Sequence, residues 1–350
     1  MSKYLFYNLL FFFCFLILLE IFLSLLPVNQ GFNFKEVNSK NEILRAEENQ
    51  VLIKSKFWNF YNSQNIKINN FGFRNDNQYN INDENVVSII GDSYVEAIQV
   101  PFNETFFNVF DEQIDSKFNV YSFGFSGAPL SQYLKWAEYA TEQFRVSHVI
   151  FNIVANDFDE SLLKYKQGEG FFYFKECSPA HLCSIMIPYE KKSYNWILGS
   201  SLIRYLIYNL EITELPEKLN SFINNPISEE SRFFANTEIN VSKEKLYDSK
   251  LAIDFFFKEL ERLDIKKENV IFIVDGRFYN KNLDNYFNQM RDYFLYTCNN
   301  LGYNSIDMKK HFNLHYSQNN MRFELERDGH WNKVAHLLVG ETIADYFNKN

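Results

Sequence analysis

One serine, one histidine and one aspartate occupy positions from which nucleophilic chemistry is possible. Ser93 comes directly after a Gly-Asp pair that ends the short apolar run Val86–Ile90. His330 and Asp328 share the sequence ERDGHWN near the end of the chain, just before a helical pattern. A serine hydroxyl becomes a good nucleophile when a neighbouring base removes its proton and a third group orients that base. These three residues are candidates for such a set if the fold brings them together.

The other histidines and the other carboxylate near Ser93 fit structural roles better. Asp92 is placed to accept N–H bonds from its own loop. The sequence around Ser93 is not the G-x-S-x-G elbow of α/β-hydrolases, because residue 95 is Val. The remaining histidines open an apolar run, lie between two cysteines or fit surface and packing positions: His148, His181, His311, His315 and His336.

Elements that can position these residues follow one another in a regular order from residue 85. Short apolar runs predict strands at 86–90, 118–124, 147–157, 269–276 and 304–308. Helical spacing of apolar residues predicts helices at about 104–116, 129–144, 244–264 and 332–347. Strands that alternate with helices predict an α/β fold with a parallel sheet covered on both faces.

Polar residues and glycines gather where the predicted strands end. Ser93 follows the first strand, Gly124 and Gly127 follow the second, and Asn156 and Asp157 end the third. Sites of open α/β sheets lie beyond the carboxyl ends of the strands. We therefore expect these residues to share one edge of the sheet.

The N-terminus predicts the cellular compartment. Residues 4–26 form an apolar run of the length that a membrane span needs, with no small-x-small cleavage pattern before Pro27. We interpret the run as an uncleaved signal anchor that leaves residues 1–3 in the cytoplasm and exports the rest. This makes the chain a single-pass protein of the inner (cytoplasmic) membrane. Glu20 is an anomaly in the run, because a carboxyl group in hydrocarbon is costly.

Patterning divides the rest of the chain. Residues 27–80 are polar and irregular, and we expect a stalk and an extended lead into the domain. Residues 81–350 form the predicted α/β domain, with a large insertion at about 158–243 where the strand–helix alternation stops.

Composition excludes several classes of protein. The net charge of -9 is opposite to the basic face of a nucleic-acid-binding protein. The four cysteines lack the paired spacing of a zinc site, and no metal or organic cofactor is implied. Cys177 and Cys183 are close in sequence, so in an exported segment they either form a disulfide or remain two free thiols.

Four blocks of the sequence resemble, in order, those of the GDSL/SGNH hydrolase superfamily: GDSYVEA, YSFGFSGAPLSQY, VAND and DGHWN. The resemblance implies a flavodoxin-like three-layer α/β/α sandwich with a parallel central sheet. It also implies that Ser93 is the nucleophile, His330 the general base and Asp328 its orienter. The oxyanion hole would consist of the Ser93 N–H, the Gly127 N–H and the Asn156 side chain.

Two departures from the superfamily's pattern narrow the resemblance. Val154 replaces the usual glycine of the third block, and the last block reads D-x-H with Arg327 at the usual aspartate position. The shorter last block, followed by Trp331 and Asn332, resembles membrane-associated SGNH-like acetyltransferases and esterases of polysaccharides.

The resemblance and the anchor imply serine-dependent ester hydrolysis or acyl transfer, with acetyl as the expected group, on a cell-envelope or exported glycan. Three alternatives stay open. The same residues would serve a lipid esterase or thioesterase. The chain would otherwise be an acetyltransferase partnered with a multi-span membrane acyltransferase. The last alternative is a non-catalytic protein that binds or assembles glycans on an SGNH fold.

Overall fold

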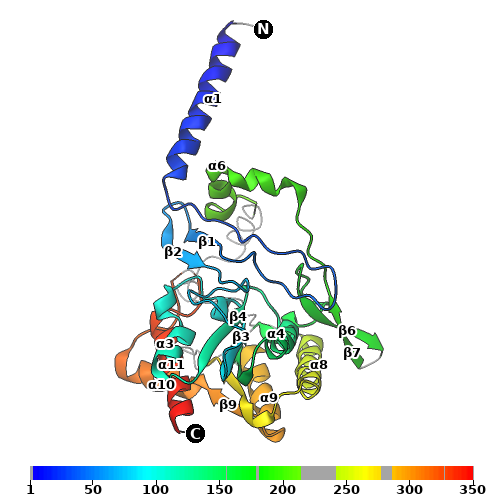
Figure 1. Ribbon diagram of the computed structural model, residues 1–350. Helices are drawn as coiled ribbons and strands as arrows, with labels where there is room; N and C mark the ends of the chain where they lie inside the picture. Colours follow the sequence, from blue (N-terminus) through cyan, green and yellow to red (C-terminus); the bar gives the residue numbers. More distant parts are fainter. Residues whose placement is uncertain are drawn as a thin grey trace.

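The computed structural model describes residues 3–154, 156–178, 181–213, 242–276, 286–326 and 328–349 (Figure 1). Part of the predicted insertion, residues 214–241, and the departure noted at Arg327 lie outside the described residues.

A parallel five-stranded sheet forms the centre of the molecule, in the order β4-β3-β5-β8-β9. Its strands are β3 (Val86–Gly91), β4 (Asn119–Gly124), β5 (Val146–Ile153), β8 (Val270–Val274) and β9 (Asn304–Asp307). All residues of β3 and β8 are buried, as expected of strands covered on both faces. Gly91 and Gly124 are opposite each other, so β3 and β4 end at the same level.

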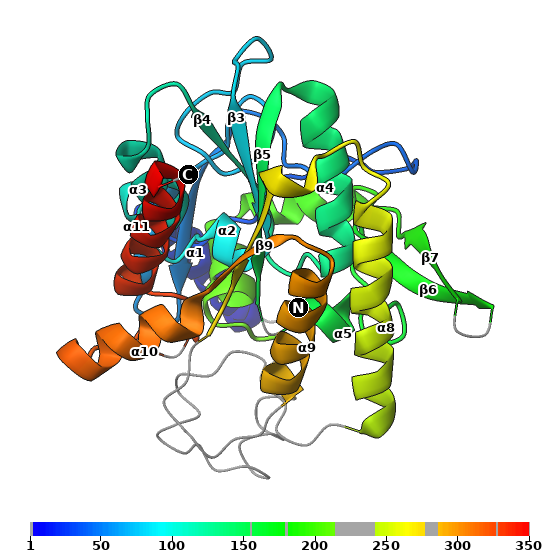
Figure 2. The same ribbon diagram turned by 90° about the horizontal axis from the view of Figure 1, so that it is seen from below.

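Helices cover both faces of this sheet (Figure 2). One face carries α3 (Phe106–Gln113) and α11 (Lys333–Lys349), and the other carries α4 (Leu130–Gln143), α8 (Lys243–Leu260) and α9 (Tyr286–Asn300). The alternation of side chains along β3 explains this arrangement, since Val87 and Ile89 pack with α3 and α11 while Ile90 packs with α4. The structure confirms the predicted parallel sheet and its three-layer α/β/α class.

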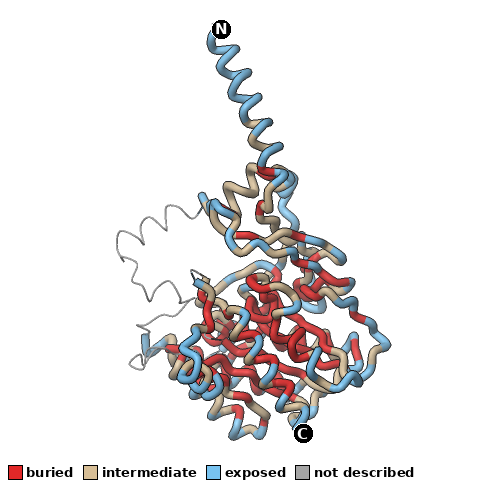
Figure 3. Tube along the Cα trace, turned by 90° about the vertical axis from the view of Figure 1, so that its left-hand side faces the viewer, coloured by how far each residue is buried: buried red, intermediate tan, exposed pale blue. Residues whose placement is uncertain are grey.

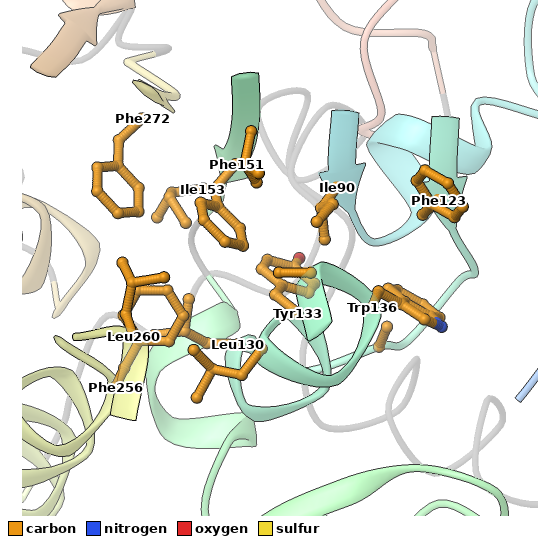
Figure 4. Packing of buried hydrophobic residues seen from close by; sticks show 14 of the residues in the cluster. Ile90, Phe123, Leu130, Tyr133, Trp136, Phe151, Ile153, Phe256, Leu260 and Phe272 are labelled. Carbon is orange, nitrogen blue, oxygen red and sulfur yellow. The ribbon is translucent and has the colours of Figure 1, made fainter. Parts of the chain in front are cut away.

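The buried side chains are concentrated in this body, whereas the N-terminal helix is exposed (Figure 3). Aromatic rings fill the face beneath α4, where Tyr133 and Trp136 pack against the sheet residues Phe123 and Phe151 (Figure 4). The other helical elements of this body are α2 (Ser93–Glu96), η1 (Phe102–Glu104), η5 (Lys267–Asn269) and α10 (Met308–Asn319).

The N-terminal helix α1 (Lys3–Ser24) has the length and the apolar composition that a membrane-spanning helix needs.

Residues 27–80, where a stalk is expected, contain the antiparallel pair β1 (Val51–Lys56) and β2 (Tyr61–Lys67). The same segment contributes buried side chains to the core, including Phe73 and Tyr79.

The segment that follows β5 adds a second antiparallel pair and a helical stretch. The pair consists of β6 (Phe172–Ser178) and β7 (His181–Met186), and a disulfide joins Cys177 to Cys183 across it. The helical elements are α5 (Asp157–Glu160), η2 (Ser193–Gly199), α6 (Ser201–Arg204) and η3 (Tyr205–Asn209).

Candidate active site

The fold brings Ser93, His330 and Asp328 together from the two ends of the domain. Ser93 begins α2 directly after β3, and its Oγ lies 2.8 Å from His330 Nε2. His330 Nδ1 lies 2.5 Å from Asp328 Oδ1. Backbone hydrogen bonds hold the two ends of this segment together, because the N–H of Leu325 donates to the His330 carbonyl over 2.8 Å and the N–H of Gly329 donates to the Leu325 carbonyl over 3.1 Å. A shortened last block therefore still gives a hydrogen-bonded serine–histidine–aspartate set.

The partners of His330 define how its ring is used. An aspartate carboxylate is only an acceptor, so Nδ1 carries the proton toward Asp328 and Nε2 can accept the Ser93 hydroxyl proton. Burial alone would raise the pKa of Asp328, but the hydrogen bond from His330 and the charge of Lys56 outweigh it and lower that pKa to about 2. Asp328 is thus ionised at neutral pH and can stabilise a protonated His330.

Lys56 is a member of the site that sequence reasoning missed. Its Nζ lies 2.9 Å from Asp328 Oδ2, the oxygen that His330 does not use. Lys56 ends β1, within the region where a stalk is expected. Nothing in the local pattern of KSK links this lysine to an aspartate near the other end of the chain, so only the tertiary structure could find it.

Asp92 supports the nucleophile from the other side. Its Oδ1 caps α2 by accepting the Tyr94 N–H over 3.0 Å, and its Oδ2 lies 3.3 Å from Ser93 Oγ. Burial raises the pKa of Asp92 to about 6, opposite to the shift at Asp328. Tyr94 also packs against the His330 ring, with the two ring centroids 5.0 Å apart. Of the two carboxyl groups near the serine, Asp328 is the one that stays charged across the whole neutral range.

Gly127 lies in the loop after β4 and adopts a φ of +80°, which glycine tolerates best. The preceding residue holds this loop in place, because the Ser126 N–H donates to Glu96 Oε2 over 3.0 Å and the Ser126 hydroxyl bonds the same oxygen. Glu96 is itself the last residue of α2. The loop that would present the Gly127 N–H is therefore attached to the element that carries the serine.

Asn156 lies after β5, at the same sheet edge, but its amide has another partner. Its Nδ2 donates to Glu160 Oε2 over 2.9 Å, and the same oxygen bonds Lys166 Nζ. A Cβ built on Gly127 would lie 3.4 Å from that Nζ, so Lys166 borders the loops that carry Gly127 and Asn156. Glu160 thus engages one N–H of the Asn156 amide, and the second N–H of the same amide is the donor that an oxyanion could use without breaking this bond.

Asp157 fixes the turn in which Asn156 lies. Its Oδ2 accepts the Val154 N–H over 2.7 Å, and its Oδ1 accepts the Tyr133 hydroxyl over 2.7 Å. Burial raises the pKa of Asp157 well above its usual range. Val154 is fully buried in the α3–α11 face, which accounts for a large apolar residue where the third block usually has glycine.

His336 is a packing residue, as expected. Its Nδ1 accepts the Phe106 N–H over 3.3 Å, and burial lowers its pKa to about 3. Within the part of the chain that the structure describes, no group of three or more His, Cys, Asp or Glu residues could hold a metal ion.

No protein-family model matches the chain, and no curated protein matches it. Solved structures match it at low identity. One is a member of the lipolytic protein G-D-S-L family from Veillonella parvula DSM 2008, with 10% identity, 76% of this chain and 99% of that chain covered, and a TM-score of 0.40. Another is an acetyl xylan esterase, with 12% identity, 75% and 98% covered, and a TM-score of 0.40. A third is a carbohydrate acetylesterase family member from Sinorhizobium meliloti, with 9% identity, 76% and 98% covered, and a TM-score of 0.39.

The first of these structures carries the name of the family that the sequence blocks resemble.

Proposed function

We propose that this protein is a serine esterase or O-acyltransferase that uses Ser93 as nucleophile, His330 as general base and Asp328 as orienter. One observation carries the proposal: His330 lies within hydrogen-bond distance of Ser93 Oγ through one ring nitrogen and of Asp328 through the other. This is the arrangement that activates a serine hydroxyl.

The proposed reaction proceeds in two halves. Nε2 of His330 removes the hydroxyl proton, and Ser93 Oγ attacks the ester carbonyl carbon to give a tetrahedral oxyanion. Collapse of this intermediate breaks the bond to the leaving alcohol, which takes the proton back from His330 and leaves an acyl-serine. Water or a sugar hydroxyl then attacks the acyl-serine by the same proton transfers. We assign the oxyanion hole to the N–H groups of Ser93 and Gly127 and to the Asn156 amide.

The proposed substrate is an acylated glycan of the cell envelope or an exported glycan, with acetyl as the transferred group. Export is supported by the apolar helix α1 and by the Cys177–Cys183 disulfide, since disulfides persist in oxidising compartments. We infer an inner-membrane orientation with residues 1–3 in the cytoplasm and the domain outside. Lipid ester or thioester hydrolysis by the same residues is the competing activity, and it predicts a preference for long acyl chains over acetyl esters.

The first experiment is labelling of the detergent-solubilised full chain with a fluorophosphonate probe. We expect the wild type to be labelled and Ser93→Ala and His330→Ala not to be, because the probe reacts with activated serines. Ser317→Ala and His181→Ala change exposed residues of α10 and β7 and should label like the wild type.

An unlabelled wild type that hydrolyses p-nitrophenyl acetate no faster than Ser93→Ala would contradict the enzymatic proposal. That result would favour a non-catalytic glycan-binding or assembly protein. If labelling succeeds, release of acetate compared with acetyl transfer to an oligosaccharide separates an esterase from an acyltransferase, including one that depends on a multi-span membrane partner.

A further inference from the structure

A second apolar segment lies beside the foot of α1. Residues 196–210 read WILGSSLIRYLIYNL and contain a single charged residue, Arg204. They cover the end of η2, all of α6 and all of η3. Trp196 is 80% exposed and Leu210 is 37% exposed, so part of this segment has no cover from the protein. Figure 1 shows α6 next to the end of α1 that leads into the domain.

Glu20 joins this segment to α1. Its carboxylate accepts the Ser200 hydroxyl over 2.7 Å, the Ser201 N–H over 2.7 Å and the Leu202 N–H over 2.8 Å. Glu20 precedes the last residue of α1, Ser24, by four positions, which is about 6 Å along a helix axis. When α1 crosses a bilayer, the first turn of α6 therefore lies at the level of its boundary. These bonds also explain a carboxyl group in an apolar helix.

The turn between β1 and β2 belongs to the same surface. Trp58 in this turn is 72% exposed, and its carbonyl accepts the Tyr205 hydroxyl over 3.0 Å. Asn209 is buried, and its Nδ2 donates to the Phe57 carbonyl over 3.3 Å. The turn is thus attached to η3 at two points. Tryptophan and tyrosine are the residues that favour the boundary between lipid and water.

We propose that residues 196–210 and Trp58 form a membrane-binding surface, and that its occupant is the lipid bilayer that α1 crosses. Apolar residues at the height of a membrane boundary, next to a transmembrane helix, are stabilised by burial among headgroups and acyl chains. Because α1 holds this surface at the bilayer, a protein partner could bind it only by displacing lipid.

The surface also places the active site near the bilayer. Lys56 bonds Asp328 and lies two residues before Trp58, so its Cα lies no more than about 7 Å from that of the tryptophan, the separation that a fully extended chain would give. The serine–histidine–aspartate set is consequently held next to the membrane. Resting on the proposed function, we infer that the acyl donor or the acceptor is a molecule carried at the bilayer surface rather than one free in solution.

Tryptophan fluorescence tests the surface without any measurement of activity. The chain has four tryptophans, α1 contains none, and Trp136 and Trp331 are fully buried. The full-length protein would be reconstituted in phosphatidylcholine nanodiscs with and without brominated acyl chains, and excited selectively at tryptophan. We expect bromine to quench the wild type and Ser93→Ala equally, Trp196→Phe and Trp58→Phe less, and the double variant least. Quenching that is absent from the wild type, or equal in the wild type and the double variant, overturns the proposal.

A rate comparison tests the inferred substrate. Trp196→Asp should lower deacetylation of an acetylated glycolipid held in the nanodisc several-fold and leave hydrolysis of soluble p-nitrophenyl acetate unchanged. Tyr296→Asp, at a 65% exposed position of α9, is the matched control and should change neither rate. Equal rates of Trp196→Asp and wild type on the glycolipid, or a wild type that hydrolyses p-nitrophenyl acetate but not the glycolipid, overturn the inference about the substrate. A failure of the proposed function would look different. The wild type would then hydrolyse neither substrate, while bromine would still quench its tryptophan fluorescence.

Discussion

At the scale of single residues, the site is arranged around the Asp328 carboxylate, which has one partner on each oxygen. Asp328 shares its two carboxylate oxygens between His330 and Lys56, so each partner fixes the orientation that the other needs. The sequence predicted Ser93, His330 and Asp328 because these types stand in recognisable blocks. It could not predict Lys56, because an ion pair between distant segments leaves no local pattern.

Replacement of Lys56 by methionine should slow the reaction without abolishing it. The side chain is 37% exposed, so solvent screens the pair, and we expect a loss in kcat of about tenfold or less. Loss of the cation also raises the pKa of Asp328 above its value of about 2, and the acid side of the pH–rate profile should move to higher pH. The measurement is kcat and KM for p-nitrophenyl acetate from acid to neutral pH.

Two further variants make this test specific. Lys67→Met removes an ion pair with Asp76 from the neighbouring strand β2, away from the site, and should behave as wild type. Lys56→Arg keeps the charge and should restore most of the rate. Identical pH profiles for Lys56→Met and Lys67→Met would refute a positioning role for Lys56.

At the scale of elements, the central strands were predictable and the two antiparallel pairs were not. The strands β3 and β8 are buried on both faces and therefore appear as continuous apolar runs. By contrast, β2 has the sequence YNSQNIK and only one buried residue, so it carries no apolar signal. The third predicted strand, 147–157, ends earlier, at Ile153, because the Asp157 carboxylate accepts the Val154 N–H and turns the chain into α5.

The loop after β4 gives a prediction about the oxyanion hole. Gly127 and Gly302 adopt φ values of +80° and +78°, so an alanine at either position should cost about 1 kcal/mol of stability. Only Gly127→Ala should lower kcat, because strain in its loop moves the N–H that we assign to the oxyanion. A built Cβ at Gly302 meets nothing within 4 Å, which makes Gly302→Ala the matched control. Thermal unfolding and ester hydrolysis of both variants would be compared, and equal kcat values would remove Gly127 from the proposed hole.

At the scale of the whole molecule, residues 27–80 connect the membrane helix, the active site and the core. Their polar composition predicts a stalk. In the structure most of their side chains are exposed or half-buried. The buried ones connect the segment to the rest of the domain. The Arg74 guanidinium donates to the carbonyls of Glu96 and Val100 over 2.7 Å each, and so closes the end of α2. These contacts join distant segments, and neither composition nor periodicity reports them.

The last prediction concerns where the folding unit begins. Tyr79 supports β4, because its hydroxyl donates to the Ser122 carbonyl over 2.9 Å and its ring stacks on Tyr121 at 3.9 Å. Phe73 is fully buried against Phe123. Loss of one such aromatic side chain costs about 3–5 kcal/mol, and a whole domain is stable by only about 5–15 kcal/mol. A chain of residues 81–350 should therefore lack cooperative thermal unfolding in detergent, whereas a chain of residues 27–350 should retain it.

Within the full chain, Phe73→Ala should destabilise by about 3–5 kcal/mol and the exposed Trp58→Ala by about 0.5 kcal/mol or less. If residues 81–350 unfold cooperatively at the same temperature as residues 27–350, the domain folds without residues 27–80. The main contribution of residues 27–80 to the site would then be Lys56.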